Sequence, residues 1–371
     1  MDIYERLDVK KYINAHDTYT NYGGSRMAKN TLKAMEQAAG SFVDIFELQR
    51  KLCDKIAQMT HNEAVYITNG ASGGLLLAAA VCMSEGDMFR YTHLPDTSRM
   101  KNEIIVMCCQ RNAYDMALAA SGATVMEIGD ADETLAFELE GAINDKTAAI
   151  FYFASSLYAK ASLPLEKVIS IAKQHSIPVV VDAAAQLPPV ENLWMFTGMG
   201  ADMVLFSGGK TLCGPQASGL IIGTKKMIDS CRKFGAPVHG ICRSSKVGRE
   251  EMVGLFVALE NYLAIDHNED YGRLKSIAER LGKAMEDTGA FKTELLPRGP
   301  VGQTYPRILG KIILDFKAED LAAMMRNNDP GIYIGIDRTL ENAIYLSPLN
   351  LGDHEVEIVI SVLTECVNRL I

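Results

Sequence analysis

The sequence contains no long hydrophobic run. Its longest uninterrupted apolar stretch, Leu75–Met83, has nine residues, whereas a membrane-spanning helix needs roughly 20. The N-terminal stretch MDIYERLDVKKY carries no apolar segment of the kind found in secretory signals. An excess of positive charge is also lacking, because 37 basic and 46 acidic residues give a formal net charge of −9, which offers nucleic acid no general binding surface. We therefore expect a soluble, cytoplasmic protein that binds neither membranes nor nucleic acid.

Patterns typical of metal sites are missing as well. None of the eight cysteines forms a CxxC pair, and the histidines show no HxxxH or HExxH spacing, which are the spacings that zinc sites use. Most cysteines lie within apolar stretches, where buried, reduced thiols are expected. The sequence therefore predicts no metal site and a reducing compartment.

The chain is long enough for one large domain and one smaller domain. Apolar residues make up 48% and charged residues 22% of its 371 residues, as in ordinary globular proteins. We expect an N-terminal arm and helix over residues 1–45, a large domain over 46–248, and a long helix with a small α+β domain over 249–371.

The large domain alternates short apolar runs with helical periodicity. The expected strands are Ala64–Thr68, Glu103–Met107, Thr124–Ile128, Ala148–Phe153, Pro178–Asp182, Asp202–Ser207 and Gly219–Gly223. The helix-like segments between the earlier strands are Gly73–Met83, Ala113–Ser121, Ala136–Ile143 and Leu165–His175. Apolar strands separated by helices indicate an α/β fold with a mostly parallel seven-stranded sheet and helices on both faces. The last two strands have no helix between them, so we expect that edge to be antiparallel.

The small domain mixes strands and helices. Its expected elements are strands over Arg307–Phe316, Ile332–Ile336 and Ala343–Leu346, a helix over Glu319–Arg326, and a terminal helix from His354.

Lys210 follows an apolar strand in the segment ADMVLFSGGKTLCGPQASGLIIG, residues 201–223. Desolvation of a lysine at such a strand end favours the neutral, nucleophilic amine. The triplet GKT at 209–211 also suggests a nucleotide phosphate loop. That motif needs a glycine where Val204 stands and a helix after it, whereas a strand is expected here. An exposed lysine in a glycine turn remains an alternative.

Two further features lie at strand ends. Asp182 ends the apolar strand in PVVVDAAAQ, where its carboxylate could pair with a protonated ring nitrogen or a metal, or cap a turn. In YITNGASGGL the amides of Gly70, Ala71 and Ser72 lie where a helix begins, which suits a phosphate. A phosphate site, a partner for a ring nitrogen and a lysine after a strand together match the needs of pyridoxal 5′-phosphate (PLP).

Four segments resemble the selenocysteine synthase (L-seryl-tRNA selenium transferase) family of PLP enzymes, which has the aspartate-aminotransferase-like fold, or PLP fold type I. They are INAHDTYTNYGGSRM at 13–27, ITNGASGGLLL at 67–77, VLFSGGKTLCGPQASGLIIG at 204–223, and RSSKVGREEMVGLFVALE at 243–260. The resemblance implies the same fold, with PLP as the cofactor.

The resemblance also implies roles for single residues. Lys210 would hold PLP covalently, and Asp182 would pair with the pyridine nitrogen. Ser207 would bind the cofactor phosphate with Gly70, Ala71 and Ser72, and Gln186 would reach the phenolic oxygen. At Cys109-Gln110-Arg111 relatives commonly place an aromatic residue or a histidine against the ring, so here Gln110 or a neighbour would contact it, which departs from the pattern.

The reaction that the resemblance implies is elimination of water and ammonia from a 2-amino-3-hydroxy sugar acid phosphate of the D-glucosaminate 6-phosphate type. The candidate cations for this small anionic substrate are Arg26, Arg243, Lys246, Arg249 and Arg307, because cationic side chains, arginine above all, bind carboxylate and phosphate groups. Ordinary ion pairs or subunit contacts are the alternative for these side chains.

Other activities stay open at this point. They are an aldol-type or C–S lyase acting on a small amino acid, a selenium transferase-related protein, and a PLP-binding regulator. Relatives that charge tRNA are longer, with an extra N-terminal region, so selenium transfer is the less expected activity. The resemblance further implies a homo-oligomer with its sites at a dimer interface.

Overall fold

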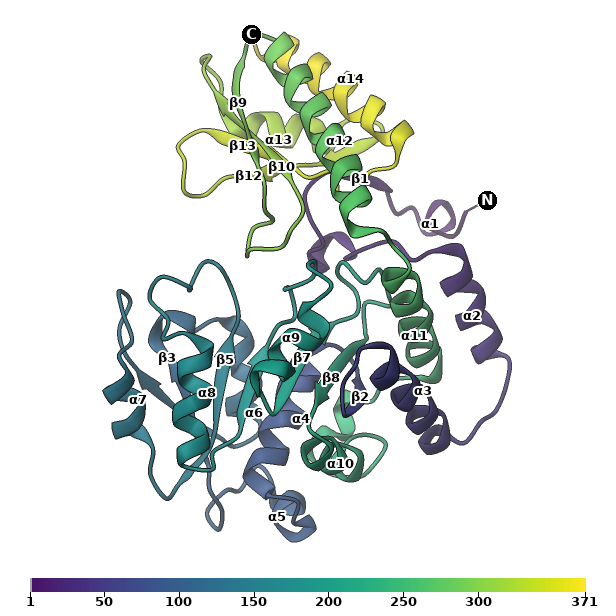
Figure 1. Ribbon diagram of the computed structural model, residues 1–371. Helices are drawn as coiled ribbons and strands as arrows, with labels where there is room; N and C mark the ends of the chain where they lie inside the picture. Colours follow the sequence, from purple (N-terminus) through teal and green to yellow (C-terminus); the bar gives the residue numbers. More distant parts are fainter. Residues whose placement is uncertain (1) are drawn as a thin grey trace. The chain divides into compact units, whose positions relative to one another are not determined.

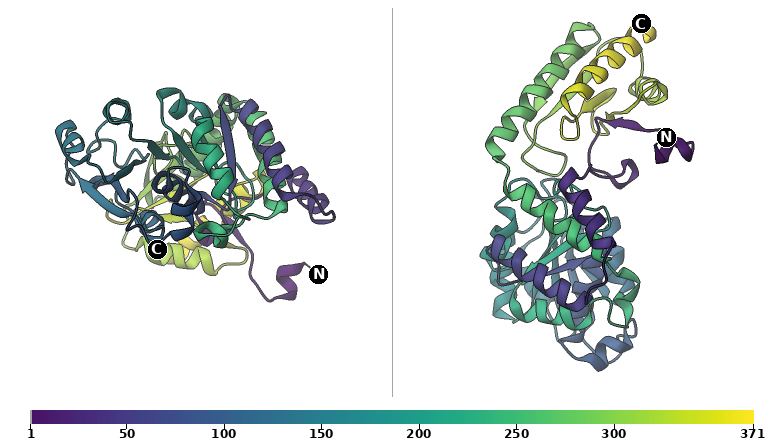
Figure 2. Two further views of the ribbon diagram at one scale, coloured as in Figure 1. Left: turned by 90° about the horizontal axis from the view of Figure 1, so that it is seen from below. Right: turned by 90° about the vertical axis from the view of Figure 1, so that its right-hand side faces the viewer.

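The computed structural model describes residues 2–371, which form two compact units (Figure 1). The larger unit is Met27–Ala264, and the smaller unit combines the arm up to Arg26 with Ile265–Ile371. These divisions differ from the expected ones, since the helices α2 (Lys29–Ala39) and α11 (Arg249–Leu263) both fall in the larger unit. The two helices pack on each other, and both views of Figure 2 show purple α2 beside green α11.

The larger unit is built on a mixed seven-stranded sheet, which confirms the expected α/β class. In spatial order its strands are β2 (Ala64–Thr68), β8 (Gly219–Gly223), β7 (Met203–Ser207), β6 (Val179–Asp182), β5 (Thr147–Phe153), β3 (Glu103–Met107) and β4 (Thr124–Ile128). Strand β8 is antiparallel to both β7 and β2, and the other neighbours are parallel. The antiparallel strand was expected at the edge, but it lies one strand inside because β2 pairs with its outer side.

Helices cover both faces of this sheet. Besides α2 and α11, they are α3 (Ile45–Met59), α4 (Ala71–Ser84), α5 (Met88–His93), α6 (Met116–Ala120), α7 (Ala136–Ala142), α8 (Leu165–Gln174), α9 (Asn192–Met199) and α10 (Lys225–Phe234). Alternate residues of β3 enter different cores. Ile105 packs in the core that contains α3 and α8 residues, and Ile104 in the core that contains α4 and α10 residues. This alternation is the consequence of a two-residue strand period in a sheet covered on both sides.

The smaller unit has the expected α+β texture. Its antiparallel sheet has the order β12 (Gly335–Ile336), β13 (Ala343–Leu346), β10 (Arg307–Ile312) and β9 (Phe291–Leu296), and β1 (Tyr12–Asn14) pairs in parallel with β11 (Gly331–Tyr333). Its helices are α1 (Ile3–Arg6), α12 (His267–Asp287), α13 (Ala318–Asn327) and α14 (Asp353–Leu370). Strand β9 was not expected from the sequence, because only its first residue, Phe291, is fully buried.

None of the helices within residues 2–371 combines the length and apolar character that crossing a membrane requires.

Candidate active site

Three expected functional segments meet at one edge of the large sheet. Strand β8 is antiparallel to both β2 and β7, so β2 and β7 run in the same direction, as does β6. The carboxyl ends of all three strands therefore lie at the same edge, the place where α/β sheets bind ligands. Asp182 ends β6, Ser207 ends β7, and Gly70 follows β2 before α4.

The loop that carries Lys210 is tightly folded. The amide of Gly208 donates to the Ser218 carbonyl at 2.8 Å, and the Cys213 amide donates to the Lys210 carbonyl at 2.9 Å. A Cβ added at Gly208 would lie 2.1 Å from Ser218 Oγ, and one added at Gly209 would lie 2.5 Å from Gln216 Oε1. The close crossing of the chain thus explains the two glycines before the lysine. It holds Lys210 half-buried after the end of β7.

Asp182 is held in a charged environment at the end of β6. Its Oδ1 accepts the Ala184 amide at 2.9 Å. Burial raises the pKa of the Asp182 carboxyl, while the Ala184 hydrogen bond and the charge of Lys210 oppose that rise. A carboxylate that is desolvated in this way gains from a cationic hydrogen-bond donor. A protonated pyridine nitrogen is such a donor, so Asp182 fits the role expected of it.

The N-terminus of α4 fits a phosphate group. Gly70 precedes the helix with φ +112°, where a side chain would be strained, and no side chain caps this end. The first turn contains no acidic residue, so its amides are available to an anion. A Cβ at Gly219 would lie 2.7 Å from the carbonyl carbon of Gly70 and 3.0 Å from the Ala71 nitrogen. A residue with a side chain at position 219 would therefore collide with this turn, whereas Gly219 does not. Ser72 is exposed within the turn.

Two glutamines expected at the cofactor lie near these strand ends. Gln186 is half-buried on the segment that follows Asp182. Gln110 is fully buried, donates from Nε2 to Ser162 Oγ at 2.8 Å, and accepts the Phe153 amide at 2.9 Å. Gln110 thus ties the end of β3 to the end of β5. Its contact with the cofactor ring stays a prediction, as does that of Gln186.

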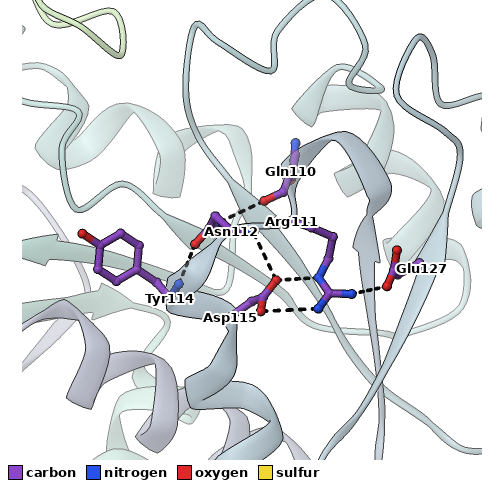
Figure 3. A network of polar contacts seen from close by, with 6 residues as sticks. All are labelled: Gln110, Arg111, Asn112, Tyr114, Asp115 and Glu127. Carbon is purple, nitrogen blue, oxygen red and sulfur yellow. Dashed lines mark hydrogen bonds and ion pairs between the residues drawn. The ribbon is translucent and has the colours of Figure 1, made fainter. Parts of the chain in front are cut away.

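The residues after Gln110 form a polar network that the sequence did not reveal (Figure 3). Arg111 lies between Asp115, whose Oδ2 is 2.5 Å from Nε, and Glu127. Asn112 donates from its side chain to the Gln110 carbonyl at 2.9 Å, and its amide donates to Asp115 at 3.2 Å. Arg111 is therefore bound within the network, which cross-links the loop at the carboxyl end of β3 to Glu127 of β4.

The expected substrate cations fall into two groups. Arg26 pairs with Glu355 at 2.7 Å, and Arg249 binds the Ala38 and Ala39 carbonyls at the end of α2 at 2.9 and 2.8 Å. Both arginines thus make the ordinary contacts that the sequence left open. A role of either toward substrate stays a prediction.

Arg243 and Lys246 lie in and after the 3-10 turn Ile241–Ser245. This turn lies beside the N-terminal end of α4, because a Cβ at Gly73 would be 3.4 Å from Ser245 Cβ.

Arg307 belongs to a cluster in the smaller unit that sequence reasoning did not assemble. Its guanidinium lies over the ring of Tyr345, 5.0 Å from the centroid, and the Tyr345 hydroxyl is 3.2 Å from Nδ1 of His16. Burial, followed by the charges of Arg307 and Arg338, lowers the pKa of His16 to about 4. The sequence feature that could have pointed to this cluster is the run of polar and aromatic residues in the arm that contains His16.

Comparisons with known proteins show which proteins this chain is similar to. Residues 17–281 match the L-seryl-tRNA selenium transferase family. D-glucosaminate-6-phosphate ammonia lyase of Salmonella typhimurium is 32% identical over 98% of this chain and 97% of its own length. 5'-C-glycyluridine monooxygenase-decarboxylase of a Streptomyces species is 30% identical over 89% of this chain and 83% of its own.

The chain is also similar to solved structures of PLP enzymes. A structure of D-glucosaminate-6-phosphate ammonia-lyase superimposes with a TM-score of 0.87 at 31% identity, covering 100% of this chain and 99% of the other. A PLP-bound serine palmitoyltransferase shares the fold alone, with a TM-score of 0.61 at 12% identity and coverage of 97% and 88%. The expected fold type I is confirmed, and its PLP cofactor fits the residues described above. The chain belongs to the L-seryl-tRNA selenium transferase family of PLP-dependent enzymes.

Proposed function

We propose that this protein is a PLP-dependent ammonia-lyase acting on a 2-amino-3-hydroxy sugar acid phosphate of the D-glucosaminate 6-phosphate type. The C3 hydroxyl leaves as water, and hydrolysis of the resulting imine consumes one water and releases ammonia. The net change is loss of ammonia, which leaves a 2-keto-3-deoxy acid phosphate. The proposal is supported by the near full-length similarity to an enzyme of that name.

The observation that carries it is the meeting of Lys210, Asp182 and the uncapped N-terminus of α4 at one sheet edge. Bound PLP supplies a carbonyl that captures the substrate amine and a conjugated ring that accepts the electrons of Cα. The chain's own groups must then hold that ring, orient the substrate and move protons.

Each residue has a distinct task in this proposal. Lys210 Nζ holds the cofactor at rest, takes the proton from substrate Cα once the substrate amine has displaced it, and returns a proton to the departing C3 hydroxyl. Asp182 keeps a proton on the pyridine nitrogen. Ser207 and the Gly70–Ser72 turn bind the cofactor phosphate.

The substrate's carboxylate and phosphate need cations of their own. Arg243 and Lys246 lie beside the phosphate-binding turn, and Arg307 lies in the smaller unit. These three remain our candidates for the two anionic groups. We further propose that the protein is cytoplasmic and forms a homo-oligomer with its sites at a dimer interface. Sedimentation of the purified protein tests the oligomeric state.

The decisive experiment incubates the purified holoenzyme with D-glucosaminate 6-phosphate and measures ammonia and 2-keto acid together. We expect equal amounts of both products, and none from Lys210→Ala. Borohydride reduction followed by peptide mapping should place PLP on Lys210. Failure to release ammonia from any substrate in a panel of 2-amino-3-hydroxy acid phosphates would exclude the lyase.

The same panel separates the alternatives. An aldehyde product from an amino acid would indicate an aldol-type enzyme, and sulfide release a C–S lyase. Conversion of seryl-tRNA would indicate selenium transfer. PLP bound to Lys210 without turnover of any substrate would leave the PLP-binding regulator.

A further inference from the structure

A second cavity lies in the larger unit at the other end of the strands from Lys210. It has a volume of about 340 Å³ and is lined at the start of three parallel strands by Ala148, Pro178 and Asp202. Strand β7 runs from this cavity to the lysine loop, and its five residues span roughly 17 Å. The cavity is therefore separate from the site described above. In Figure 1, α10 and the junction of α4 and α5 mark this edge of the unit.

Three lysines from different segments line the cavity. Lys173 lies in the last turn of α8, Lys226 in the first turn of α10, and Lys101 in the segment before β3. A lysine cluster drawn from three distant segments makes a local cationic surface on a chain whose formal net charge is −9.

The acidic groups around the cavity do not balance these lysines. Glu85 lies 3.6 Å from the Lys101 ammonium and also pairs with Arg90. Across residues 2–371, Lys173 and Lys226 take part in no ion pair with a carboxylate. Two cations thus face the cavity unneutralised by direct contact.

Asp202 is the acidic group that these two lysines influence from a distance. It accepts the Val179 amide at 2.8 Å, so one of its oxygens is committed to the sheet. Burial raises the pKa of Asp202, and the charges of Lys173 and Lys226 oppose that rise. With the Lys101–Glu85 pair taken as neutral, the two lysines and Asp202 leave a net positive charge in the cavity.

The position of Lys173 depends on Gly200. A Cβ added at Gly200 would lie 2.6 Å from Lys173 Nζ, and Gly200 has φ +108°. The ammonium therefore lies against bare backbone at the end of α9, on the wall of the cavity. Part of the remaining wall is apolar, because Val81, Ile177 and Met227 contribute to it, and Ser176 and Ser230 also line the cavity.

We propose that this cavity binds a small phosphorylated organic anion, with Lys173 and Lys226 on the phosphate and the apolar wall against the carbon skeleton. The volume falls within the range of about 300–1,000 Å³ found for small-molecule sites. Lysine binds phosphate as a compact point charge without a required geometry. The occupant is a molecule of sugar-phosphate size, and it binds at the edge of the sheet away from Lys210.

The test measures chemical acetylation of single lysines in the holoenzyme by mass spectrometry. Glucose 6-phosphate is the probe, because it has no amine to react at the cofactor. At millimolar probe we expect several-fold slower acetylation of Lys173 and Lys226 and no change at Lys225. Lys225 is the matched control, since it neighbours Lys226 but pairs with Asp229 and does not line the cavity.

Variants complete the test by calorimetry on the holoenzyme. In the double variant Lys173→Gln with Lys226→Gln, the heat from at least one glucose 6-phosphate binding site should disappear. In Lys225→Gln that heat should remain. Unchanged acetylation of all three lysines with the probe would overturn the proposal. Equal protection by inorganic phosphate would overturn the role of the apolar wall. Slow acetylation without any anion, relieved by dilution, would show a second copy covering the cavity and would also overturn it.

Discussion

The Tyr345 hydroxyl lies 3.2 Å from Nδ1 of His16, joining residues 329 positions apart in the chain. His16 comes from the N-terminal arm and Tyr345 from strand β13, and both belong to the smaller unit. The His16 ring also contacts Tyr19 and Tyr22, at centroid distances of 5.1 and 4.9 Å. The arm is thus packed into the smaller unit through an aromatic cluster around a neutral imidazole.

This imidazole should make stability depend on pH. Its pKa is lowered from 6.5 to about 4, so the unfolded chain takes up a proton at a higher pH than the folded chain. The contribution is complete above pH 6.5 and declines as the pH falls toward 4, by up to about 3 kcal/mol. We expect His16→Gln to flatten this decline in the free energy of unfolding, measured by urea denaturation between these pH values. The exposed His239 offers the control, and an equal effect of His239→Gln would contradict the assignment to His16.

Asp17 and Tyr305 form a buried pair in the same unit. Asp17 is 3% exposed, and it accepts the Tyr305 hydroxyl at 3.1 Å and 3.0 Å through its two oxygens. Tyr305→Phe removes only that donor and leaves a buried carboxylate short of a partner, so we expect a loss of about 1–3 kcal/mol of unfolding free energy. Thermal denaturation checks this, with Tyr305→Phe combined with Asp17→Asn as the second variant. If the pair is the cause, the double variant should lose less than the two single losses added together.

Gly219 should be essential for cofactor binding. A Cβ there would press on Gly70 and Ala71, the turn that we expect to bind the PLP phosphate. We expect Gly219→Ala to lower the affinity for PLP at least about tenfold, which corresponds to the loss of one charge-assisted hydrogen bond. Titration of the apoprotein with PLP measures this. Gly141→Ala in α7 is the control, because nothing lies within 4 Å of its added Cβ, and unchanged PLP affinity in Gly219→Ala would exclude the close contact.

Asp182 should act on the reaction more than on cofactor attachment. Asp182→Asn keeps a carbonyl oxygen for the Ala184 amide but lacks the negative charge that holds a proton on the ring nitrogen. We expect covalent attachment at Lys210 to persist while ammonia release falls at least about a hundredfold. Single-turnover assays and peptide mapping check the two parts. Wild-type turnover in this variant would remove Asp182 from the mechanism.

Much of the larger unit could be predicted from sequence because its strands are local apolar runs. Thr124–Ile128 and Gly219–Gly223 were placed with the bounds that the structure has. Strand ends and Gly-rich turns are also local features, so Lys210, Asp182 and Gly70 stood out without knowledge of the fold. The family resemblance supplied the cofactor, which no single run of residues could specify.

Tertiary structure decided what depends on distant partners. Strand β8 lies inside the sheet because β2 pairs with its free side. The sequences of the two strands do not specify at which edge of the sheet β2 pairs. Gln110 is fixed by Ser162, Arg249 by the end of α2, and His16 by Tyr345. The sequence by itself determined the local runs, the strand-end residues and the charge of the chain. Only folding determined which of those charges met a partner and which faced a cavity, because these contacts join segments far apart in the chain.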